Sequence, residues 1–581
     1  MLNLLGKNLG AYKRYAIIAP LFILIETAAG LIMPRIMSDI VDLGIAAGNT
    51  QQIFRNGILM AVLAVIGLLA GISSSRMVTI ASQGVGSNLR TSIFRHMQTF
   101  SFADVDRFST ASLITRATTD VNTIQTIFQM SLRILSMAPF QLIVSLAIVF
   151  SYSGKLALIF LCAIPVLFGF VMLLMKMVHH LFMVMREKLD NVNSTVQENL
   201  VAIRVVKSFV REDYEREKFK KANNALTKAG LNAISKMVLM MPVATIIINS
   251  VMLLIYWFGG NMVGSGALAP GGLLAIISYL TQIMLSVMMF SMIMMQLPRA
   301  QTSSERISEV LSANSDIKDP PAPISGAAEL KGQVEFKNVH FRYSATGSGE
   351  DVIKGISFTA KPGETVAVVG DTGSGKSSLV NLIPRFYDVS EGQVLVGGVD
   401  VREQRLEELR DGIGMVLQKN VLFSGTIREN MKWGSPYASD EEIISALKDA
   451  QAYDFVSKFP EGLDYMIAQG GTNVSGGQRQ RLCIARAIIK QPSILILDDS
   501  TSAVDSDTES KIRKSFDESL KNCTVFIIAQ RISSVVSADK IIVLDENGGV
   551  DGIGTHDELM GKSRVYQEIY SIQQKGGLSD V

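Results

Sequence analysis

The run TVAVVGDTGSGKSSLV, residues 365–380, decides the fold of the second half of this chain. Its first residues are mostly apolar and β-branched, which predicts a buried strand, and the residues after Lys376 predict a helix. Between the two elements, Gly370, Gly373 and Gly375 allow backbone N–H groups to converge on an anion. The spacing matches G-x-x-x-x-G-K-[ST] and therefore predicts a loop that holds nucleotide phosphates.

The residues of this loop are the first candidate ligands for a nucleotide and its Mg²⁺ ion. Lys376 supplies a positive charge for the β- and γ-phosphate oxygens, and the hydroxyl of Ser377 is expected to reach the metal. The predicted nucleotide contacts are Gly370, Asp371, Thr372, Gly373, Ser374, Gly375, Lys376, Ser377 and Ser378.

A second predicted strand supplies carboxylates. Residues 494–499 read Ile-Leu-Ile-Leu-Asp-Asp, which indicates a buried strand that ends at Asp498. Asp498 is expected to hold Mg²⁺ through its coordination shell. A water-activating base at the next position is usually glutamate, but this chain has Asp499, which is one methylene shorter.

The surrounding sequence has the pattern of an α/β domain. From about Lys331, short β-rich runs alternate with helical stretches, which predicts a largely parallel sheet. Tyr343, near the start of this domain, could stack on adenine or could equally be a core residue.

A second anion-binding edge is predicted about 100 residues after the glycine loop. The residues that open a helix there, and that expose N–H groups and a hydroxyl to an anion, are Ser475, Gly476, Gly477 and Gln478. Because the glycine loop already holds phosphates, this edge makes sense if it closes over a nucleotide held by another copy. A simple helix N-cap is the alternative.

The first half of the chain has the composition of a membrane protein. Of 581 residues, 48% are hydrophobic and 19% are charged, and the mean hydropathy is +0.30. Six apolar segments are each long enough to cross a hydrocarbon core of ~30 Å at ~20 residues per helix. They lie near residues 15–37, 57–75, 134–153, 156–176, 237–258 and 271–297.

The charge pattern predicts the orientation of these spans and the division of the chain. Two long polar segments, after the second and fourth spans, are rich in Lys and Arg, which places them and both chain ends in the cytoplasm of a cell-membrane protein. Helical spacing within them predicts stalks that continue the spans, with helices lying on the membrane as the alternative. We expect a membrane domain at 1–311, a linker at 312–330 and a nucleotide-binding domain at 331–581. The net charge of +2 gives no reason to expect nucleic-acid binding.

The motifs together resemble those of a known family. Val474–Gln478, between the glycine loop and the aspartate strand, resembles the signature of ATP-binding cassette (ABC) proteins, and six spans joined to one cassette look like a bacterial half-transporter of the multidrug and lipid exporter type. The resemblance implies ATP as the nucleotide and a dimer with two ATP molecules, each between the glycine loop of one chain and the signature of the other. It also implies short helices that press on the cassettes, within 104–121 and 198–219.

The resemblance assigns roles to further residues. Tyr343 matches the aromatic residue that stacks on adenine, and Gln418 matches the glutamine that senses γ-phosphate and Mg²⁺. Ser502 to Asp505 match the loop that crosses between cassettes, and Asp505 is thereby a predicted nucleotide contact.

Two departures from the family pattern predict a degenerate ATP site. The usual catalytic glutamate is Asp499, and the usual switch histidine is Gln530. A shift of a carboxylate by about 1 Å can lower a rate by ~10²-fold, and glutamine cannot titrate as imidazole does. The signature is nearly intact, with Val474 in place of leucine, while Gln469 replaces a more usual glutamate. We therefore expect a heterodimer whose partner supplies the glutamate and the histidine; the alternative is a slow homodimer.

Polar and methionine residues within the spans are candidates for a substrate path. Glu26 is expensive in hydrocarbon and should face a cavity or a partner. It could attract cationic amphiphiles, or it could pair with Arg35 on the same span. Asn249 and Gln282 are weaker candidates. Met284, Met288, Met292 and Met295 follow one face of the sixth span and suit varied apolar ligands or ordinary packing.

These patterns favour an ATP-driven exporter half that moves an amphipathic small molecule, lipid or peptide across the bilayer. An ATP-gated or regulatory membrane protein without transport is the second hypothesis, and an importer on the same architecture is the third.

Overall fold

A computed structural model of the chain describes residues 2–325, 331–343, 349–499, 506–520, 522–529 and 532–577. The chain divides into two compact units, which are described separately here. The first unit comprises Met1–Gln98 and Ala111–Ala313, and the second comprises Thr99–Thr110 and Asn314–Val581.

The first unit is built from long helices. Among the described residues, 6 candidate membrane spans are long and apolar enough to cross a bilayer: Asn3–Ile45, Thr50–Met97, Thr110–Tyr152, Gly154–Val201, Glu212–Gly264 and Pro270–Ser312. Each is more than twice the ~20 residues that a bilayer requires, so the helices extend well past the hydrocarbon thickness.

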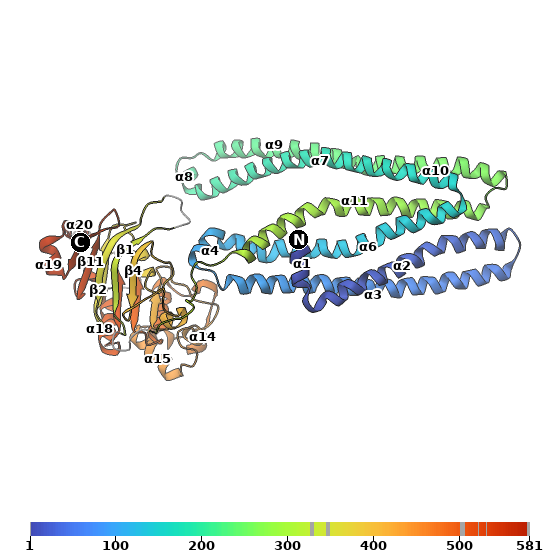
Figure 1. Ribbon diagram of the computed structural model, residues 1–581. Helices are drawn as coiled ribbons and strands as arrows, with labels where there is room; N and C mark the ends of the chain where they lie inside the picture. Colours follow the sequence, from blue (N-terminus) through green and yellow to red (C-terminus); the bar gives the residue numbers. More distant parts are fainter. Residues whose placement is uncertain are drawn as a thin grey trace. The chain divides into compact units, whose positions relative to one another are not determined.

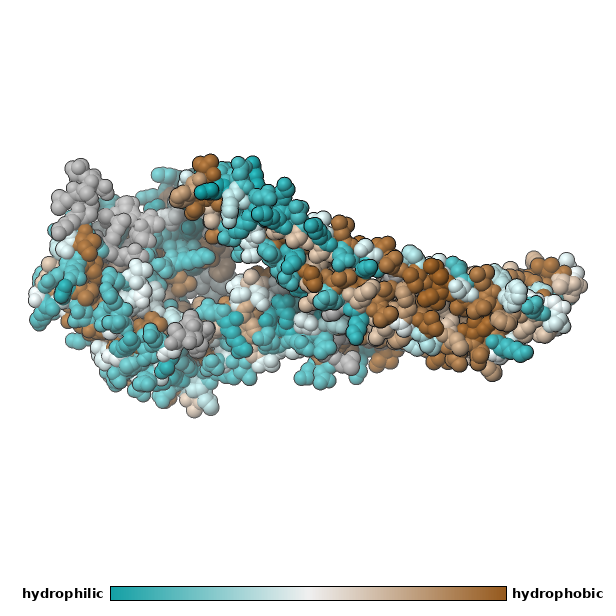
Figure 2. Space-filling model, turned by 90° about the horizontal axis from the view of Figure 1, so that it is seen from above, coloured by the Kyte–Doolittle hydropathy of each residue, from teal (hydrophilic) through white to brown (hydrophobic). Residues whose placement is uncertain are grey.

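Apolar runs predict the spans of this unit, and helical spacing in the polar segments predicts the stalks that continue them. Their bounds are α1 (Leu2–Leu9), α2 (Lys13–Asp39), α3 (Thr50–Met97), α5 (Thr110–Thr115), α6 (Val121–Tyr152), α7 (Gly154–Val201), α8 (Ile203–Ser208), α9 (Glu212–Val238), α10 (Met240–Gly264) and α11 (Pro270–Ser312). Helix α2 packs on α3, α6 on α11, and α7 on α9, as Figure 1 also shows. Hydrophobic side chains gather on the surface of the long helices (Figure 2).

Two π-helical segments interrupt the first unit and place carboxylates against α11. In η2 (Ile40–Ile45), Asp42 accepts a hydrogen bond of 2.7 Å from the Gly271 backbone N–H, in the first turn of α11. In η3 (Arg116–Asp120), Asp120 accepts a bond of 2.9 Å from Ser303, near the other end of α11. Helix α11 is therefore tied at both ends to aspartates from irregular backbone, where π-helical turns often mark functional positions.

The second unit contains a six-stranded sheet of order β12-β11-β3-β10-β9-β6, in which only β12 runs antiparallel to its neighbour. In β3, Val366 and Val368 belong to one hydrophobic core, and Ala367 and Val369 belong to the other. The sheet is therefore covered on both faces, as a parallel sheet requires. Its strands are β3 (Thr365–Gly370), β6 (Ile413–Val416), β9 (Ile494–Asp498), β10 (Thr524–Ile528), β11 (Lys540–Leu544) and β12 (Val550–Gly554).

Two smaller sheets and a set of short helices complete this unit. An antiparallel sheet has the order β2-β1-β4-β5, and a small sheet pairs β7 with β8. The strands are β1 (Val334–Phe341), β2 (Ile353–Ala360), β4 (Glu391–Val396), β5 (Val399–Asp400), β7 (Gly425–Thr426) and β8 (Met466–Ile467). The helices are α12 (Lys376–Asn381), α13 (Leu406–Asp411), α14 (Ile427–Met431), α15 (Asp440–Asp449), α16 (Tyr453–Val456), α17 (Gly476–Ile488), α18 (Ser506–Ser519), α19 (His556–Lys562) and α20 (Arg564–Gly577).

One short helix from the first polar segment belongs to the second unit. Helix α4 (Phe102–Phe108) begins at a capping box formed by Ser101 and Asp104. Its Phe102 ring packs against Phe386, with ring centroids 4.5 Å apart. The Tyr387 hydroxyl donates a hydrogen bond of 3.2 Å to the Asp106 carboxylate. The region predicted to press on a cassette thus makes aromatic and polar contacts in this unit.

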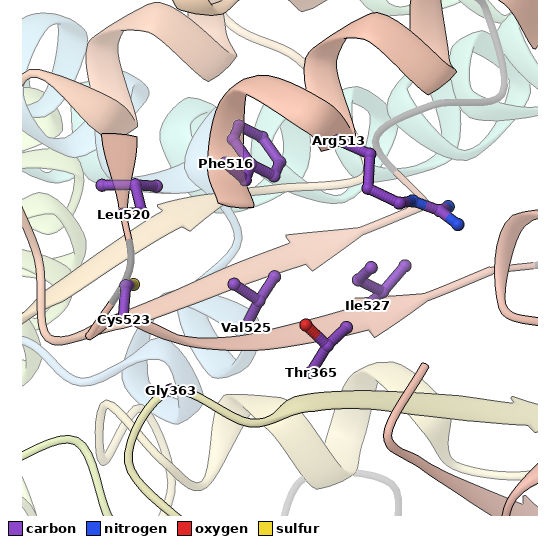
Figure 3. Close-up of a pocket in the computed structure, with 8 residues that line it drawn as sticks. All are labelled: Gly363, Thr365, Arg513, Phe516, Leu520, Cys523, Val525 and Ile527. Carbon is purple, nitrogen blue, oxygen red and sulfur yellow. The ribbon is translucent and has the colours of Figure 1, made fainter. Parts of the chain in front are cut away.

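A small pocket lies between α18 and the sheet (Figure 3). It is lined by Gly363, Thr365, Arg513, Phe516, Leu520, Cys523, Val525 and Ile527. Thr365 begins β3 and Cys523 precedes β10, so the pocket lies toward the amino ends of these strands. Arg513 is already bonded to Glu509 and Ser537, and burial raises the pKa of the Cys523 thiol to about 12. None of the predicted nucleotide ligands lines this pocket.

Candidate functional site

The predicted phosphate and metal ligands meet at the carboxyl edge of the large sheet. Strands β3 and β9 both pair in parallel with β10, and Ile528 of β10 lies opposite both Val368 and Asp498. Because parallel strands end at one edge, the loop after β3 and the carboxylates after β9 come together, although they are separated by more than 100 residues of sequence.

The glycine loop has the backbone that its sequence predicts. Gly373 has φ 91° and Gly375 has φ 88°, values in the left-handed region that favour glycine. A Cβ atom at Gly375 would lie 2.9 Å from the Val352 carbonyl oxygen, so a larger residue would also clash there. Ser374 is buried between them, while Asp371 and Thr372 are exposed.

Lys376 lies across this loop. Its Nζ donates hydrogen bonds of 2.8 Å to the Gly370 carbonyl and 2.7 Å to the Asp371 carbonyl. Burial lowers the pKa of Lys376, and the nearby carboxylates of Asp371, Asp499 and Asp498 act in the opposite direction. A half-buried ammonium group that faces several oxygens is suited to phosphate binding.

Ser377 and Asp498 fit the ligand set of a magnesium ion. The Ser377 hydroxyl donates a hydrogen bond of 2.9 Å to Asp498 Oδ1, so two oxygen ligands already lie side by side. Burial raises the pKa of Asp498, and the adjacent charge of Asp499 adds to this effect. Among the described residues, no group of three or more His, Cys, Asp or Glu side chains could hold a metal. Two protein oxygens match Mg²⁺, which takes its other ligands from water and phosphates.

Asp499 is held in an unusual conformation beside Gln418. Its backbone has φ 47°, a left-handed value that aspartate adopts more readily than most residues. The Asp499 N–H donates a hydrogen bond of 3.0 Å to the Ile528 carbonyl oxygen, and this bond fixes the turn after β9. Burial raises the pKa of Asp499, and a hydrogen bond from the Gln418 side chain opposes that rise. Two of the predicted γ-phosphate residues are therefore bonded to each other.

Tyr343 lies next to the glycine loop. Its hydroxyl shares a hydrogen bond of 2.8 Å with Ser378, in α12. Its ring meets Phe341 and Tyr387 edge to face, at centroid distances of 4.8 Å and 5.2 Å. Half-buried in this cluster, Tyr343 is placed both to pack and to present an aromatic surface at the nucleotide loop.

The signature segment forms a capped and accessible helix start. The Ser475 hydroxyl accepts a hydrogen bond of 3.3 Å from the Gln478 N–H, and the Gln478 side chain accepts one of 3.0 Å from the Ser475 N–H. Ser475 and Gly476 are exposed, whereas Val474 is only 8% exposed and packs in the core. Gln469, in the turn before this helix, is exposed as well. The N-cap and the exposed anion-binding edge therefore coexist in one motif.

Some predicted residues lie outside the described part of the chain. These are Gln530, Asp505 and the rest of the 502–505 loop. Their predicted roles stay predictions.

The predicted substrate-path residues occupy different surroundings in the first unit. Glu26 forms an ion pair of 3.1 Å with Arg133 of α6, so the alternative pairing with Arg35 is wrong. Gln282 accepts a hydrogen bond of 3.4 Å from Gln141, while Asn249 is exposed on α10. Met284 is buried, Met288 packs against the same core, and Met292 is 56% exposed. The methionine stripe is thus partly core and partly surface.

Sequence reasoning missed three residues around these sites. Arg133 immediately precedes the apolar segment at 134–153. This position in the sequence could have indicated a charged residue at the end of a membrane span. Tyr387 and Asp106, which connect α4 to Tyr343, carried no motif.

Comparisons with known proteins match both halves of the chain to one family. Residues 16–287 match the model of the ABC transporter transmembrane region, and residues 353–502 match the ABC transporter model. The chain is 38% identical to an uncharacterized ABC transporter ATP-binding protein of Mycobacterium tuberculosis, over 99% of this chain and 98% of that protein. It is 32% identical to a putative multidrug export ATP-binding/permease protein of Bacillus subtilis, over 97% of each.

A solved structure has the same architecture. The structure of a bacterial Atm1-family ABC exporter with ATP bound matches with a TM-score of 0.80 and 25% identity, over 97% of this chain and 98% of that one. Six long apolar helices joined to an α/β ATPase domain are therefore confirmed. This chain belongs to the ABC transporter family and is an exporter half-transporter, in which one membrane region is joined to one ATPase domain.

Proposed function

We propose that the chain is one subunit of a heterodimeric ATP-driven exporter, that its own ATP site turns over slowly, and that its signature completes the hydrolytic site of a different partner. The proposed limits are 1–311 for the membrane domain, 312–330 for the linker and 331–581 for the nucleotide-binding domain. Both chain ends and the nucleotide-binding domain are proposed to lie in the cytoplasm, because the basic residues concentrate in the two long polar segments.

The observation that carries this proposal is the bonding of Asp499. Its carboxylate is one methylene shorter than that of glutamate and is engaged by Gln418. A base must lie within hydrogen-bond reach of the attacking water, and a misplacement of ~1 Å can lower the rate by ~10²-fold. Gln530 adds to this shortfall because an amide cannot carry a proton as imidazole does.

The residues of this chain then act mainly by binding. Lys376 and the loop N–H groups hold the phosphates of ATP, Ser377 and Asp498 would hold Mg²⁺, and Tyr343 would contact the base. Bound Mg²⁺ supplies positive charge against the phosphate oxygens. Ser475 and Gly476 present a hydroxyl and N–H groups, on an exposed edge, to the γ-phosphate held by the partner.

The transported molecule is proposed to be amphipathic. The similarity to a putative multidrug export protein and the apolar helices with few charges support this class. The coupling of ATP binding to the membrane helices would pass through α4, whose Asp106 and Phe102 contact the cassette.

A slow homodimer is the second candidate, and one observation favours it. Burial raises the pKa of Asp499, and a higher pKa makes a carboxylate a stronger base.

ATPase measurements on the purified chain, alone and with its partner, decide between the two. The heterodimer predicts little turnover alone and brisk turnover in the complex, with both rates insensitive to Asp499→Asn. Brisk turnover by the chain alone that Asp499→Asn abolishes would overturn the proposal. The partner is sought among co-purifying half-transporters that carry the glutamate and the histidine.

A further inference from the structure

One charged cluster lies among the membrane helices, and it joins three of them. Arg133 Nη2 of α6 donates to Glu26 Oε1 of α2 at 3.1 Å, and Arg133 Nη1 donates to the hydroxyl of Ser75 in α3 at 3.0 Å. The Ser74 hydroxyl donates to Glu26 Oε2 at 3.0 Å. Gly71 lies against the Glu26 carboxyl group, where an added Cβ would lie 3.2 Å away.

The two charges occupy different positions along the predicted apolar segments. Arg133 immediately precedes the segment at 134–153, whereas Glu26 lies within the segment at 15–37. Their side chains meet because α2 packs against α6.

Both charged groups remain accessible in this chain. The Arg133 side chain is 41% exposed and the Glu26 side chain is 29% exposed. The guanidinium has five N–H donors, and the carboxylate has about four acceptor positions. The structure shows two of the donors and two of the acceptor positions in use. Each group therefore keeps capacity for a ligand without losing its present partners.

Because Glu26 and Arg133 carry opposite charges, the pair favours a ligand that also carries both charges. A ligand with a single charge would favour one member and repel the other, and breaking the pair would leave a charge unpaired near the membrane, which is costly. A zwitterion meets both requirements, because its anionic group adds to Arg133 and its ammonium group adds to Glu26. An anionic phosphate or carboxylate also suits the planar fork of the guanidinium.

Apolar side chains beside the pair suit an acyl or alkyl chain. Leu132 and Met137, which flank Arg133 in sequence, are partly buried and pack against the buried Ile23 in one hydrophobic cluster. Ile72 of α3 and Met130 of α6 are exposed. A ligand whose headgroup sits on the charges can therefore lay its chain along apolar surface.

We propose that Glu26 and Arg133 form a headgroup site for a zwitterionic amphiphile, with the ammonium group on Glu26 and the anionic group on Arg133. This assignment deepens the proposed export function and depends on it for the substrate role, but the binding itself needs neither ATP nor the partner.

Equilibrium binding of radiolabelled amphiphiles to the purified full-length chain in a non-ionic detergent tests this site. Four probes share a twelve-carbon chain: dodecylphosphocholine, dodecyl dimethylglycine, dodecyl trimethylammonium and dodecyl phosphate. The account predicts that the two zwitterions bind at least ~10-fold more tightly than the cationic probe or the anionic probe. Tight binding of dodecylphosphocholine but not of dodecyl dimethylglycine would limit the ligand to zwitterions of the phospholipid type. Tight binding of both probes would extend the ligand class to carboxylate zwitterions.

Three variants separate a binding role from a structural one. Glu26→Gln and Arg133→Gln should each reduce zwitterion affinity by ~10-fold or more and remove the preference for zwitterions. The reversed pair, Glu26→Arg with Arg133→Glu, should recover the preference because the zwitterion can bind in the opposite direction. Glu309→Gln, which breaks a comparable ion pair with Arg116 elsewhere in this unit, should leave the preference unchanged.

The proposal is overturned by either of two results. One is equal affinity for all four headgroups in the wild-type chain. The other is a preference for zwitterions that survives both single substitutions in protein that elutes normally from gel filtration. ATPase activity of the same variants is measured separately, in the complex with the partner, so failure of headgroup binding can be told apart from failure of the export mechanism.

Discussion

The glycine loop and the start of α17 both present backbone N–H groups to an anion, but the residues around them differ. Beside the loop, Asp499 and Gln418 are bonded to each other, and the carboxylate is short. At α17, the Ser475 capping box is intact and its edge is exposed. This difference is the basis for the proposal that the chain holds one ATP and helps a partner to cleave the other.

The largest expected effect comes from the α17 edge. Ser475→Ala in the assembled complex should lower the ATPase rate by ~10²-fold, the usual cost of one donor that stabilises developing charge. Asp499→Asn in the same complex should change the rate by less than about 2-fold, because the rate depends on the partner's site. Steady-state phosphate release measures both. Similar losses from the two substitutions would remove the proposed difference between the edges.

A gain of function is expected at the glycine-loop edge. Asp499→Glu together with Gln530→His should raise ATP turnover by the chain alone about 10-fold. The expected gain is smaller than the ~10²-fold cost of a misplaced base. The reason is that glutamate adopts a backbone φ of 47° less readily than aspartate does. The single substitution Asp499→Glu serves as the control, with a smaller gain. An unchanged rate in the double variant would show that other residues limit this site.

A moderate effect is expected where α4 contacts Tyr387, which packs on Tyr343. Tyr387→Phe removes the hydrogen bond to Asp106 and keeps the ring that packs on Tyr343. We expect about a 3-fold loss of substrate-stimulated ATPase activity, with ATP affinity unchanged, because only the link to α4 is weakened. Tyr387→Ala should also weaken ATP binding. Equal ATP affinity in both variants would show that the Tyr343 cluster does not support the base.

The smallest effect is a stability change that depends on pH. Burial raises the folded-state pKa of Asp498, so the unfolded chain loses its proton first as pH rises, and stability falls through that window. Asp498→Asn should therefore raise the melting temperature of the nucleotide-free protein at pH 7.5 by about 2–4 °C, as ~1 kcal/mol does in a domain of this size. The gain should shrink as pH falls.

Differential scanning fluorimetry from pH 8 to pH 5 measures this change. Asp371→Asn, which alters an exposed carboxylate in the glycine loop, is the matched control and should not change the melting temperature. A lower melting temperature for Asp498→Asn at pH 7.5 would mean that the hydrogen bond from Ser377 outweighs the burial of the charge.

Features that depend on local sequence patterns could be predicted from the sequence. Apolar length predicted six long helices, and the pattern at residues 365–380 predicted a strand, a glycine loop and a helix. Ser377 and Asp498 were each assigned to the same metal ion, and their side chains share a hydrogen bond of 2.9 Å.

Features that depend on the register between distant helices were not predictable. Glu26 could be judged costly from its position, but its partner Arg133 is 107 residues away and is fixed by how α2, α3 and α6 pack. The π-helical turns that bring Asp42 and Asp120 to α11 carry no sequence motif, and neither does the contact between Tyr387 and Asp106. The bond between Gln418 and Asp499 required the pairing of β6 with β9.

The proposed difference between the two ATP sites, slow turnover at the site of this chain and rapid hydrolysis at the partner's site, is tested most directly by locating intact ATP during turnover. The complex is given a photoactivatable ATP analogue labelled on either the α- or the γ-phosphate, crosslinked during steady-state hydrolysis, and separated into its subunits. The account predicts that this chain retains both labels, whereas the partner retains the α-label and loses the γ-label. Loss of the γ-label from this chain as fast as from its partner would contradict the account.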